Sequence, residues 1–473
     1  MLSSSVNVLT TFVALLSSIS STVNALPTAA VDLSKRATPP SDDPFYVPPV
    51  GFEKTAPGTI LRERQIISSF FGILPDFVET HQLLYRTTAV NGTPIATVTT
   101  IFKPDWPRPD QFISFQTAYD SSAINCSPSY NYQWGAWQDD LISSAEFLFL
   151  QAYLLSGWIV AAPDYEGPDA AFGPGKLEGM GTLDGMRAVS NYRSKLGLSK
   201  AKPDIVGVGY SGGSIATGWA AAMHSTYASE LNIKGWVAGG IPANLTSVIN
   251  LVDDTLFSGF LPIAIAGLSK PSAYGAKLKP VIDSVLTPKG KALLDFANTQ
   301  CAVPNILNFF EQSIFSTDVQ TLGRGILQEP TVAAVLAENV LGASPDLIPR
   351  APMLMYHAAL DEIIPYADAA KLSTQWCDRG VSIDFITYGA GGHIGTEVTS
   401  LPDAIDFVEN AFDGTTKKGC SAQTKLDSIF DPIALGANLE PVATALIDFF
   451  AKIGRNDSGL KSNLALLKTP AQS

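Results

Sequence analysis

The sequence predicts an α/β fold in which helices cover both faces of a mostly parallel sheet. Short apolar runs recur along the chain, and runs that are apolar throughout are typical of strands buried on both faces of a sheet. Helix-compatible stretches lie between them, and this alternation favours parallel pairing. With 46% hydrophobic and 16% charged residues among its 473, the chain has the composition of a folded protein rather than a disordered one.

The predicted elements follow one another along the body of the chain. Strands are predicted at residues 112–115, 158–162, 204–208, 236–238, 353–357 and 383–386. Helices are predicted at about 175–194, 213–226, 366–378 and 401–412. Residues 243–348 contain apolar clusters but no convincing strand, so this interval is predicted to be a helical insertion on top of the sheet.

The N-terminal segment is predicted to direct secretion rather than to form part of the fold. An apolar stretch over residues 6–19 is short for a membrane span, and it precedes the small residues of Val23-Asn24-Ala25 at a signal-peptidase spacing. We therefore assign residues 1–25 to a signal peptide. The dibasic pair Lys35-Arg36 predicts a pro-peptide over 26–36, the alternative being an exposed basic dipeptide. The mature protein is predicted to be soluble and extracellular.

Secretion changes how the cysteines and some asparagines are interpreted. Two disulfides are predicted in an oxidising compartment, and the residues alone leave three pairings open among Cys126, Cys301, Cys377 and Cys420. Asn91, Asn244 and Asn456 each begin an N-glycosylation tripeptide.

Charge and motif content exclude several classes of function. The chain has 31 Lys and Arg against 44 Asp and Glu, a net charge of −13, and no basic tract, so no nucleic-acid partner is predicted. With four Cys, four His and neither a CxxC nor an HExxH motif, no metal and no cofactor is predicted. Oligomeric state is left open.

A candidate nucleophile lies between a predicted strand and a predicted helix. Gly209-Tyr210-Ser211-Gly212-Gly213 follows strand 204–208 and has the form G-x-S-x-G. Small residues flank the serine in such a turn because larger side chains would collide with neighbouring elements. The turn raises the hydroxyl above the sheet at a helix N-terminus, where a developing oxyanion is stabilised. A glycine-rich turn with an incidental serine is the alternative.

Ser211 needs a base, and that base needs an acid that orients it. In this class of site the chain order is Ser, acid, His. His393 follows a strand in a glycine-rich loop and is the predicted base, whereas His357 lies within an apolar strand and is interpreted as a buried structural residue. Asp361 follows strand 353–357 and is the predicted acid; the other candidates are Glu362, then Asp368 and Asp384.

Several ordered segments together resemble the fungal secretory lipase family of the α/β-hydrolase superfamily. They run through nearly the whole mature chain: Asp43-Pro44-Phe45-Tyr46, Tyr85-Arg86-Thr87-Thr88, Asp120, Cys126-Ser127-Pro128-Ser129-Tyr130, Asp164-Tyr165-Glu166-Gly167, Glu178-Gly179-Met180, residues 209–213, 357–366 and 411–416.

The resemblance implies an organisation and a set of site residues. It implies an α/β-hydrolase core over 37–242 and 349–419, a helical lid over 243–348 and a C-terminal flap or tail over 420–473. It also implies a Ser211–Asp361–His393 triad and the disulfides Cys126–Cys301 and Cys377–Cys420.

An oxyanion hole built from Asp120 and the backbone N–H of Gly212 is implied as well. Because an ionised carboxylate only accepts hydrogen bonds, the Asp120 side chain can donate only when it is protonated, whereas its backbone N–H donates at any pH. The alternative for Asp120 is a turn former at the end of a strand.

The insertion carries the apolar residues that are candidates for binding an acyl chain. Phe257, Phe260, Leu261 and Ile263 lie in one strongly apolar stretch over residues 256–268. In an insertion above an active site such a stretch is suited to lining an acyl tunnel or meeting a lipid–water interface. The alternative is that these residues only pack the insertion against the core.

The leading functional prediction is a secreted serine lipase or carboxylesterase that hydrolyses acylglycerol-type esters through an acyl-enzyme on Ser211. A short-acyl esterase or deacetylase acting on a small-molecule ester is the second hypothesis. A non-catalytic binding protein on a hydrolase fold is the third, and it has no need of an intact Ser, acid and His in this order.

Overall fold

The computed structural model describes residues 36–137 and 140–425. The predicted signal peptide lies outside the described residues, as do the predicted pro-peptide except Arg36, the glycosylation candidate Asn456 and residues 426–473 of the predicted flap. Within the described part of the chain, no helix has both the length and the apolar character that crossing a membrane requires.

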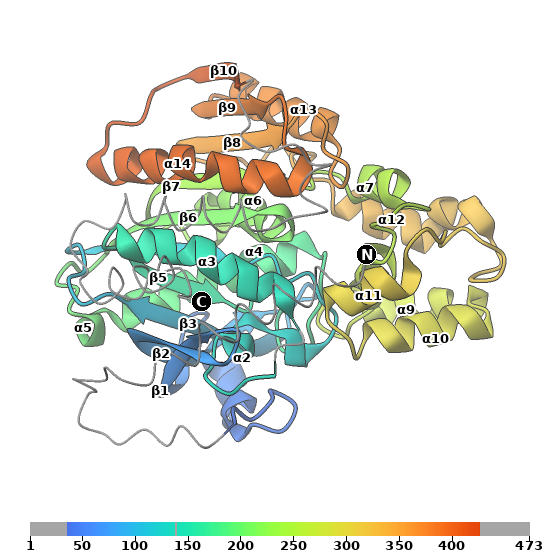
Figure 1. The fold of residues 1–473 in the computed structure, drawn as a ribbon, viewed down its shortest axis with the longest axis horizontal. Helices are drawn as coiled ribbons and strands as arrows, with labels where there is room; N and C mark the ends of the chain where they lie inside the picture. The colour runs from blue at the N-terminus through green and yellow to red at the C-terminus, as the bar shows by residue number, and fades with distance from the viewer. Residues whose placement is uncertain (1–35, 138–139, 426–473) are drawn as a thin grey trace, which may run out of the picture.

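A ten-stranded sheet forms the centre of the described structure (Figure 1). Its strands are Ile60–Phe70 (β1), Leu74–Thr88 (β2), Pro94–Lys103 (β3), Gln111–Gln116 (β4), Ile159–Pro163 (β5), Asp204–Tyr210 (β6), Asn232–Gly239 (β7), Met353–Ala358 (β8), Ile383–Tyr388 (β9) and Cys420–Lys425 (β10). They lie in the order β1-β2-β3-β5-β4-β6-β7-β8-β9-β10. The pairs from β5 through β4 and β6 to β10 are parallel, and those joining β1, β2, β3 and β5 are antiparallel. The predicted mostly parallel sheet is confirmed.

Strands β4 to β9 correspond to the strands that the sequence predicts, whereas β1, β2, β3 and β10 are not predicted. Arg62 and Glu63 are exposed on β1, and almost all of β10 is exposed. β1 and β10 are the two edge strands and lack the apolar runs of buried parallel strands, because one edge of each meets water. β2 and β3 lie inside the antiparallel part of the sheet. The sheet also continues to Lys425, beyond the core boundary expected at residue 419.

Helices form a layer on each face of this sheet, as the sequence predicts. Gly175–Asn191 (α4), Ser211–Tyr227 (α6) and Tyr366–Asp378 (α13) pack on one face, and Leu141–Leu155 (α3) and Gly392–Asp413 (α14) cover the other (Figure 1). Trp219 and Trp376 are buried in the first layer, and Phe147 and Val408 in the second. The shorter helices of the core are Pro44–Tyr46 (η1), Phe52–Lys54 (η2), Ile124–Cys126 (η3), Pro128–Asn131 (α2) and Arg193–Leu196 (α5).

The chain between β7 and β8 forms a helical unit at one side of the sheet (Figure 1). Its helices are Leu245–Val252 (α7), Phe260–Leu268 (α8), Gly275–Val285 (α9), Pro288–Ala297 (α10), Ala302–Phe309 (α11), Gly323–Gln328 (η4) and Pro330–Glu338 (α12). A separate apolar cluster that includes Leu278, Phe309 and Phe315 fills its interior. The insertion therefore has a small core of its own as well as contacts with the sheet domain.

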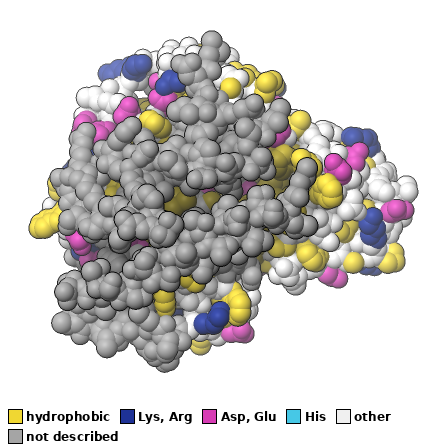
Figure 2. Space-filling view, in the orientation of Figure 1, with side chains coloured by type: hydrophobic (Ala, Val, Ile, Leu, Met, Phe, Trp, Pro, Cys, Tyr) yellow, Lys and Arg dark blue, Asp and Glu magenta, His cyan; other side chains and the backbone are white. Residues whose placement is uncertain are grey.

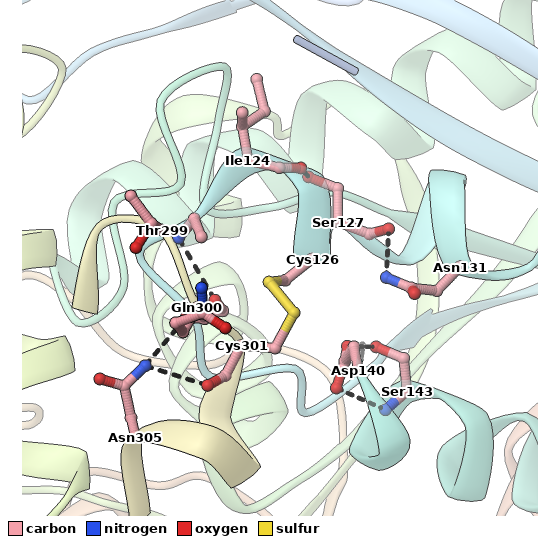
Figure 3. Close-up of a disulfide and its surroundings, with 12 residues drawn as sticks. Ile124, Cys126, Ser127, Asn131, Asp140, Ser143, Thr299, Gln300, Cys301 and Asn305 are labelled. Atoms are coloured by element: carbon pink, nitrogen blue, oxygen red, sulfur yellow. Dashed lines mark hydrogen bonds between the residues drawn. A yellow bond between two sulfur atoms is a disulfide. The ribbon is translucent and has the colours of Figure 1, made fainter. Parts of the chain in front are cut away.

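Two disulfides join parts of the chain that are distant in sequence. Cys126, at the end of η3, is bonded to Cys301, which precedes α11 and so links the insertion to the core (Figure 3). The Asn305 side chain donates to the carbonyl of Cys301 at 2.9 Å and fixes the turn that carries this cysteine. Cys377 of α13 is bonded to Cys420 of β10. These pairings are the two that the family resemblance implies.

Candidate active site

Ser211 lies at the junction between β6 and α6, at the C-terminal edge of the sheet. Its φ of 50° is in the left-handed region, which a non-glycine residue adopts only when the surrounding structure holds it there. The start of α6 places backbone N–H groups beside the hydroxyl. The local geometry is therefore that of a strained turn that presents a serine at a helix N-terminus.

The glycines after Ser211 permit close approaches that a side chain would block. A Cβ atom on Gly212 would collide with the carboxyl group of Asp120, and one on Gly213 would collide with the backbone carbonyl of Gln116. The end of β4 and the loop that follows it therefore lie directly against the turn. This contact brings the two candidate oxyanion-hole residues together.

His393 connects Ser211 to Asp361. Its Nε2 is 2.7 Å from the Ser211 hydroxyl oxygen, and its Nδ1 is 2.7 Å from Oδ2 of Asp361. His393 lies in the first turn of α14 rather than in the expected glycine-rich loop, because Gly391 and Gly392, with φ of 109° and 58°, turn the chain straight from β9 into the helix. The three side chains predicted from the sequence thus form one hydrogen-bonded chain.

The Asp361 carboxylate accepts several hydrogen bonds in addition to the one from His393. Its Oδ1 accepts from the backbone N–H groups of Ile363 at 3.0 Å and Ile364 at 2.7 Å. The alternative acid, Glu362, accepts instead from the backbone N–H of His393 at 3.0 Å. Asp361 therefore contacts the imidazole ring, and Glu362 holds the backbone that carries it.

His357 is buried at the end of β8, as the sequence-based interpretation expects, but it also contacts the site. Its Nε2 is 3.0 Å from the Ile364 carbonyl oxygen and 3.3 Å from Oδ2 of Asp361. His357 and His393 therefore meet the same carboxylate oxygen.

The ionisation of Asp361 and His393 follows from these contacts. Burial disfavours the charged form of Asp361, but His393 and the hydrogen bond from His357 outweigh burial and hold its pKa well below the usual range. Burial also disfavours the imidazolium form of His393, but the Asp361 carboxylate outweighs burial and raises the pKa of His393. Asp361 is thus ionised, and neutral His393 carries its proton on Nδ1 and can accept one on Nε2.

Asp120 lies against Gly212, in a very different environment from that of Asp361. It is 5% exposed, its φ is 45°, and its Oδ1 has no hydrogen-bond partner among the described residues. Burial raises the pKa of Asp120 to about 7, with His393 acting against this shift and Glu397 adding to it. The Asp120 side chain can therefore hold a proton near neutral pH and act as a hydrogen-bond donor.

The apolar candidates on the insertion occupy two kinds of position. Ile263 and Leu261 are buried, the former in the apolar cluster beneath α4 and α6 and the latter in the cluster of the insertion. Phe257 and Phe260 are only partly buried. The Ser122 hydroxyl donates to the Ile263 carbonyl at 2.6 Å. This hydrogen bond joins α8 of the insertion to the core at a residue two positions after Asp120.

Exposed apolar side chains lie next to Asp361 and His393 in the sequence. Leu360, beside Asp361, is 80% exposed, and Ile394, beside His393, is 58% exposed. On the insertion, Leu256, Leu307 and Phe310 are also exposed, and Figure 2 shows hydrophobic side chains scattered among polar and charged ones on the surface of this lobe.

The other predicted site features lie away from this centre. Asn91 is exposed in the turn between β2 and β3, and Asn244 caps α7 by accepting from the backbone N–H of Thr246 at 3.1 Å. No group of three or more His, Cys, Asp or Glu side chains in the described ranges is arranged to hold a metal ion.

Sequence reasoning does not identify several residues around the triad. The Tyr210 hydroxyl donates to the His393 carbonyl at 2.6 Å, and Tyr210 occupies a variable position of the G-x-S-x-G motif. Glu146 of α3 and Glu397 of α14 form a carboxyl pair near His393 and Asp120. Only the spacing of four residues between His393 and Glu397, one helical turn, gives a sequence signal for any of these contacts.

The chain is similar in sequence and in fold to known lipases. A sequence model of the secretory lipase family matches residues 133–419. The secreted triacylglycerol lipase LIP2 of Malassezia furfur is 39% identical over 439 residues, which cover 91% of this chain and 92% of that protein. The closed-state structure of Candida antarctica lipase A superimposes with a TM-score of 0.78 at 29% identity, covering 88% of this chain and 96% of the other. The esterase LipA of Xanthomonas oryzae, at 16% identity and a TM-score of 0.57 over 76% of this chain and 100% of its own, shares the fold.

Proposed function

The chain belongs to the secretory lipase family, and we propose that this carboxylic ester hydrolase cleaves triacylglycerols through an acyl-enzyme on Ser211. It is a secreted enzyme, like the relatives that are named secreted triacylglycerol lipases. The observation that carries the catalytic proposal is the hydrogen-bonded chain from the Ser211 hydroxyl through His393 to Asp361.

In the proposed reaction, Ser211 attacks the ester carbonyl while Nε2 of His393 takes the hydroxyl proton. The resulting imidazolium is stabilised by the Asp361 carboxylate and then gives its proton to the leaving alkoxide, releasing the alcohol. Water next attacks the acyl-enzyme with His393 again as base, which releases the fatty acid and restores the Ser211 hydroxyl. No further reactant is required.

The negative charge that develops on the carbonyl oxygen needs donors on the other side of Ser211. We assign this role to the backbone N–H of Gly212 and to Asp120, whose side chain lies against Gly212. The unpartnered Oδ1 of Asp120 supports the assignment because a buried polar atom without a partner is costly unless a ligand satisfies it.

Substrate access is proposed to involve the insertion. The attachment of α8 to Ser122 supports residues 243–348 as a lid, with Phe257, Phe260, Leu261 and Ile263 as candidate acyl contacts. The exposed Leu360 and Ile394, which adjoin Asp361 and His393 in the chain, together with Leu256, Leu307 and Phe310 on the insertion, support docking on a lipid–water interface.

A short-acyl esterase remains the second candidate, and one observation favours it. Leu261 is 3% exposed and Ile263 fully buried, so a long acyl chain passing along α8 must displace packed side chains. A short acyl group has no such requirement.

A chain-length series of p-nitrophenyl esters together with a triacylglycerol emulsion, assayed with wild type and Ser211→Ala, tests the proposal. Hydrolysis of the emulsion by wild type alone supports a lipase acting through Ser211. Activity confined to acetate and butyrate esters would favour the short-acyl esterase, and equal rates for the two proteins would reject catalysis by Ser211.

A further inference from the structure

A second histidine lies against the acid of the triad. His357 is fully buried, and its Nε2 faces two acceptors, the Ile364 carbonyl oxygen at 3.0 Å and Oδ2 of Asp361 at 3.3 Å. A carbonyl oxygen can only accept a hydrogen bond, so Nε2 of His357 must carry the proton that it shares between these two oxygens. Oδ2 of Asp361 is the same oxygen that His393 contacts.

The geometry suits a neutral donor. Nδ1 of His357 is buried without a partner among the described residues, and the ring packs edge-on against Tyr366 with ring centres 5.9 Å apart. Asp361 already accepts two backbone N–H bonds on Oδ1, so the N–H of His357 completes the set of donors that fixes the carboxylate plane. A neutral imidazole does this without placing a second positive charge beside His393.

We propose that His357 is a positioning residue for the hydrolytic reaction: its Nε2–H holds Oδ2 of Asp361 toward His393 and moderates the basicity of this carboxylate. The inference rests on the proposed role of Asp361 and His393. It assigns His357 a function that its position within a buried strand does not suggest, since a buried histidine in a strand otherwise only satisfies a backbone carbonyl.

The chain contains a matched control. His224 of α6 is also buried and also faces a backbone carbonyl seven residues later, with Nε2 at 3.1 Å from the Leu231 oxygen. Its ring packs edge-on against Trp236 rather than against a residue of the site. His224→Phe therefore removes the same kind of backbone hydrogen bond as His357→Phe, but no contact with the proposed triad.

The expected effect of His357→Phe on His393 has a defined sign. Without the Nε2–H donor the Asp361 carboxylate is less stabilised and attracts the Nδ1 proton of His393 more strongly, so the pKa of His393 rises further. The other titratable groups that face His393 or Asp361 are Glu362, Glu397, Asp120 and Tyr210, and all are unchanged in this variant. Because His393 must be neutral to act as base, the acidic limb of the pH profile moves to higher pH.

The test measures kcat, KM and the pH profile of ester hydrolysis for wild type, His357→Phe, His357→Gln and His224→Phe. His357→Phe is expected to lower kcat about tenfold or more with little change in KM, since Asp361 does not touch substrate. His357→Gln, whose amide N–H falls close to the position of Nε2, should recover most of the lost activity. His224→Phe should lower the melting temperature without moving the pH profile. If His357→Phe does not fold, His357→Leu takes its place.

An NMR titration of the imidazole groups in the same proteins separates this inference from the proposed function. The chain has only four histidines, so His393 is assigned by its absence from a His393→Ala spectrum. If wild type hydrolyses no ester, the proposed function fails, while the titration of His393 still tests the contact. If His393 titrates identically in wild type, His357→Phe and His224→Phe, and the two variants lose only stability, the positioning role of His357 is overturned.

Discussion

Two buried aspartates flank Ser211, and they are opposite in electrostatic character. Asp361 contacts two histidines and two backbone N–H groups, and its pKa lies well below the usual range. Asp120 has one oxygen without a partner among the described residues, and burial raises its pKa to about 7. The same side chain is therefore held as an anion on one side of the serine and can hold a proton on the other.

This difference matches what the two steps of charge development require. An imidazolium forms on the His393 side and needs a fixed negative charge, whereas an oxyanion forms on the Asp120 side and needs hydrogen-bond donors. Partners, rather than residue type or depth of burial, decide which role each carboxyl group can take. Changing the partners or the charge on either side should therefore give effects of different size and different pH dependence.

The largest effect is expected on the ionised side. Asp361→Asn keeps the size of the side chain but removes the charge that stabilises the His393 imidazolium and fixes its tautomer, so kcat should fall by about 10⁴-fold. The acidic limb should also move to lower pH, because the carboxylate that raises the pKa of His393 is gone. Steady-state kinetics as a function of pH measures both.

Glu362→Gln is the matched comparison for Asp361→Asn. Glu362 accepts a hydrogen bond from the backbone N–H of His393, and an amide oxygen can still accept it, so the loss in kcat should be far smaller. A larger loss in Glu362→Gln than in Asp361→Asn would exchange the roles of the two acids.

The next effect concerns the protonated side. Asp120→Ala removes the side-chain donor proposed for the oxyanion hole and should lower kcat by about 10²- to 10³-fold. Activity that depends on a protonated Asp120 is lost as pH rises through about 7. Asp120→Asn keeps a donor that does not titrate, so it should retain more activity than Asp120→Ala and lack this alkaline loss. An alkaline limb unchanged in Asp120→Asn would leave only the backbone N–H of Asp120 in the hole.

The sequence predicts the Ser211, Asp361 and His393 side chains, but not the contact of His357 or the raised pKa of Asp120. Ser211, Asp361 and His393 can be assigned because the G-x-S-x-G motif, strand positions and chain order constrain each of them. The contact of His357 with Asp361 cannot be predicted, because it depends on how the turn after β8 folds the acid back over the strand. Asp120 owes its raised pKa to burial, which depends on tertiary packing and which no local sequence pattern records.

The fold is predictable to a similar extent. The parallel strands β4 to β9 are apolar runs whose signal survives in the sequence. By contrast, β10 is exposed and polar, and β1 mixes polar with apolar residues, so neither gives such a signal. The pair formed by Glu146 and Glu397 joins helices that are far apart along the chain. Long-range contacts of this kind position the residues of the site that local sequence patterns cannot predict.

A third carboxylate placed in the insertion would extend the comparison. Phe260 is partly buried at the start of α8, between the clusters of the core and the insertion. Phe260→Asp adds a charge without partners, which is costly to desolvate, and should slow hydrolysis of long-chain esters by about tenfold or more relative to acetate esters. Phe260→Leu, which stays apolar, is the control. An equal loss for all chain lengths in Phe260→Asp would mean that Phe260 supports folding rather than acyl binding.

The smallest expected effect comes from the Glu146–Glu397 pair, which acts on Asp120 and His393 only through its charge. Glu146 and Glu397 face each other, so the pair holds one proton and one negative charge, and the Glu397 charge raises the pKa of both Asp120 and His393. Replacing both by Gln removes that charge, so both limbs of the pH profile should move to lower pH, by less than about one unit. Glu409→Gln on the same helix, where Glu409 pairs with Arg108 at 3.3 Å, should move neither limb. Movement of the acidic limb alone would show that the Asp120 side chain does not donate, and movement of both limbs upward would contradict the sign of the charge.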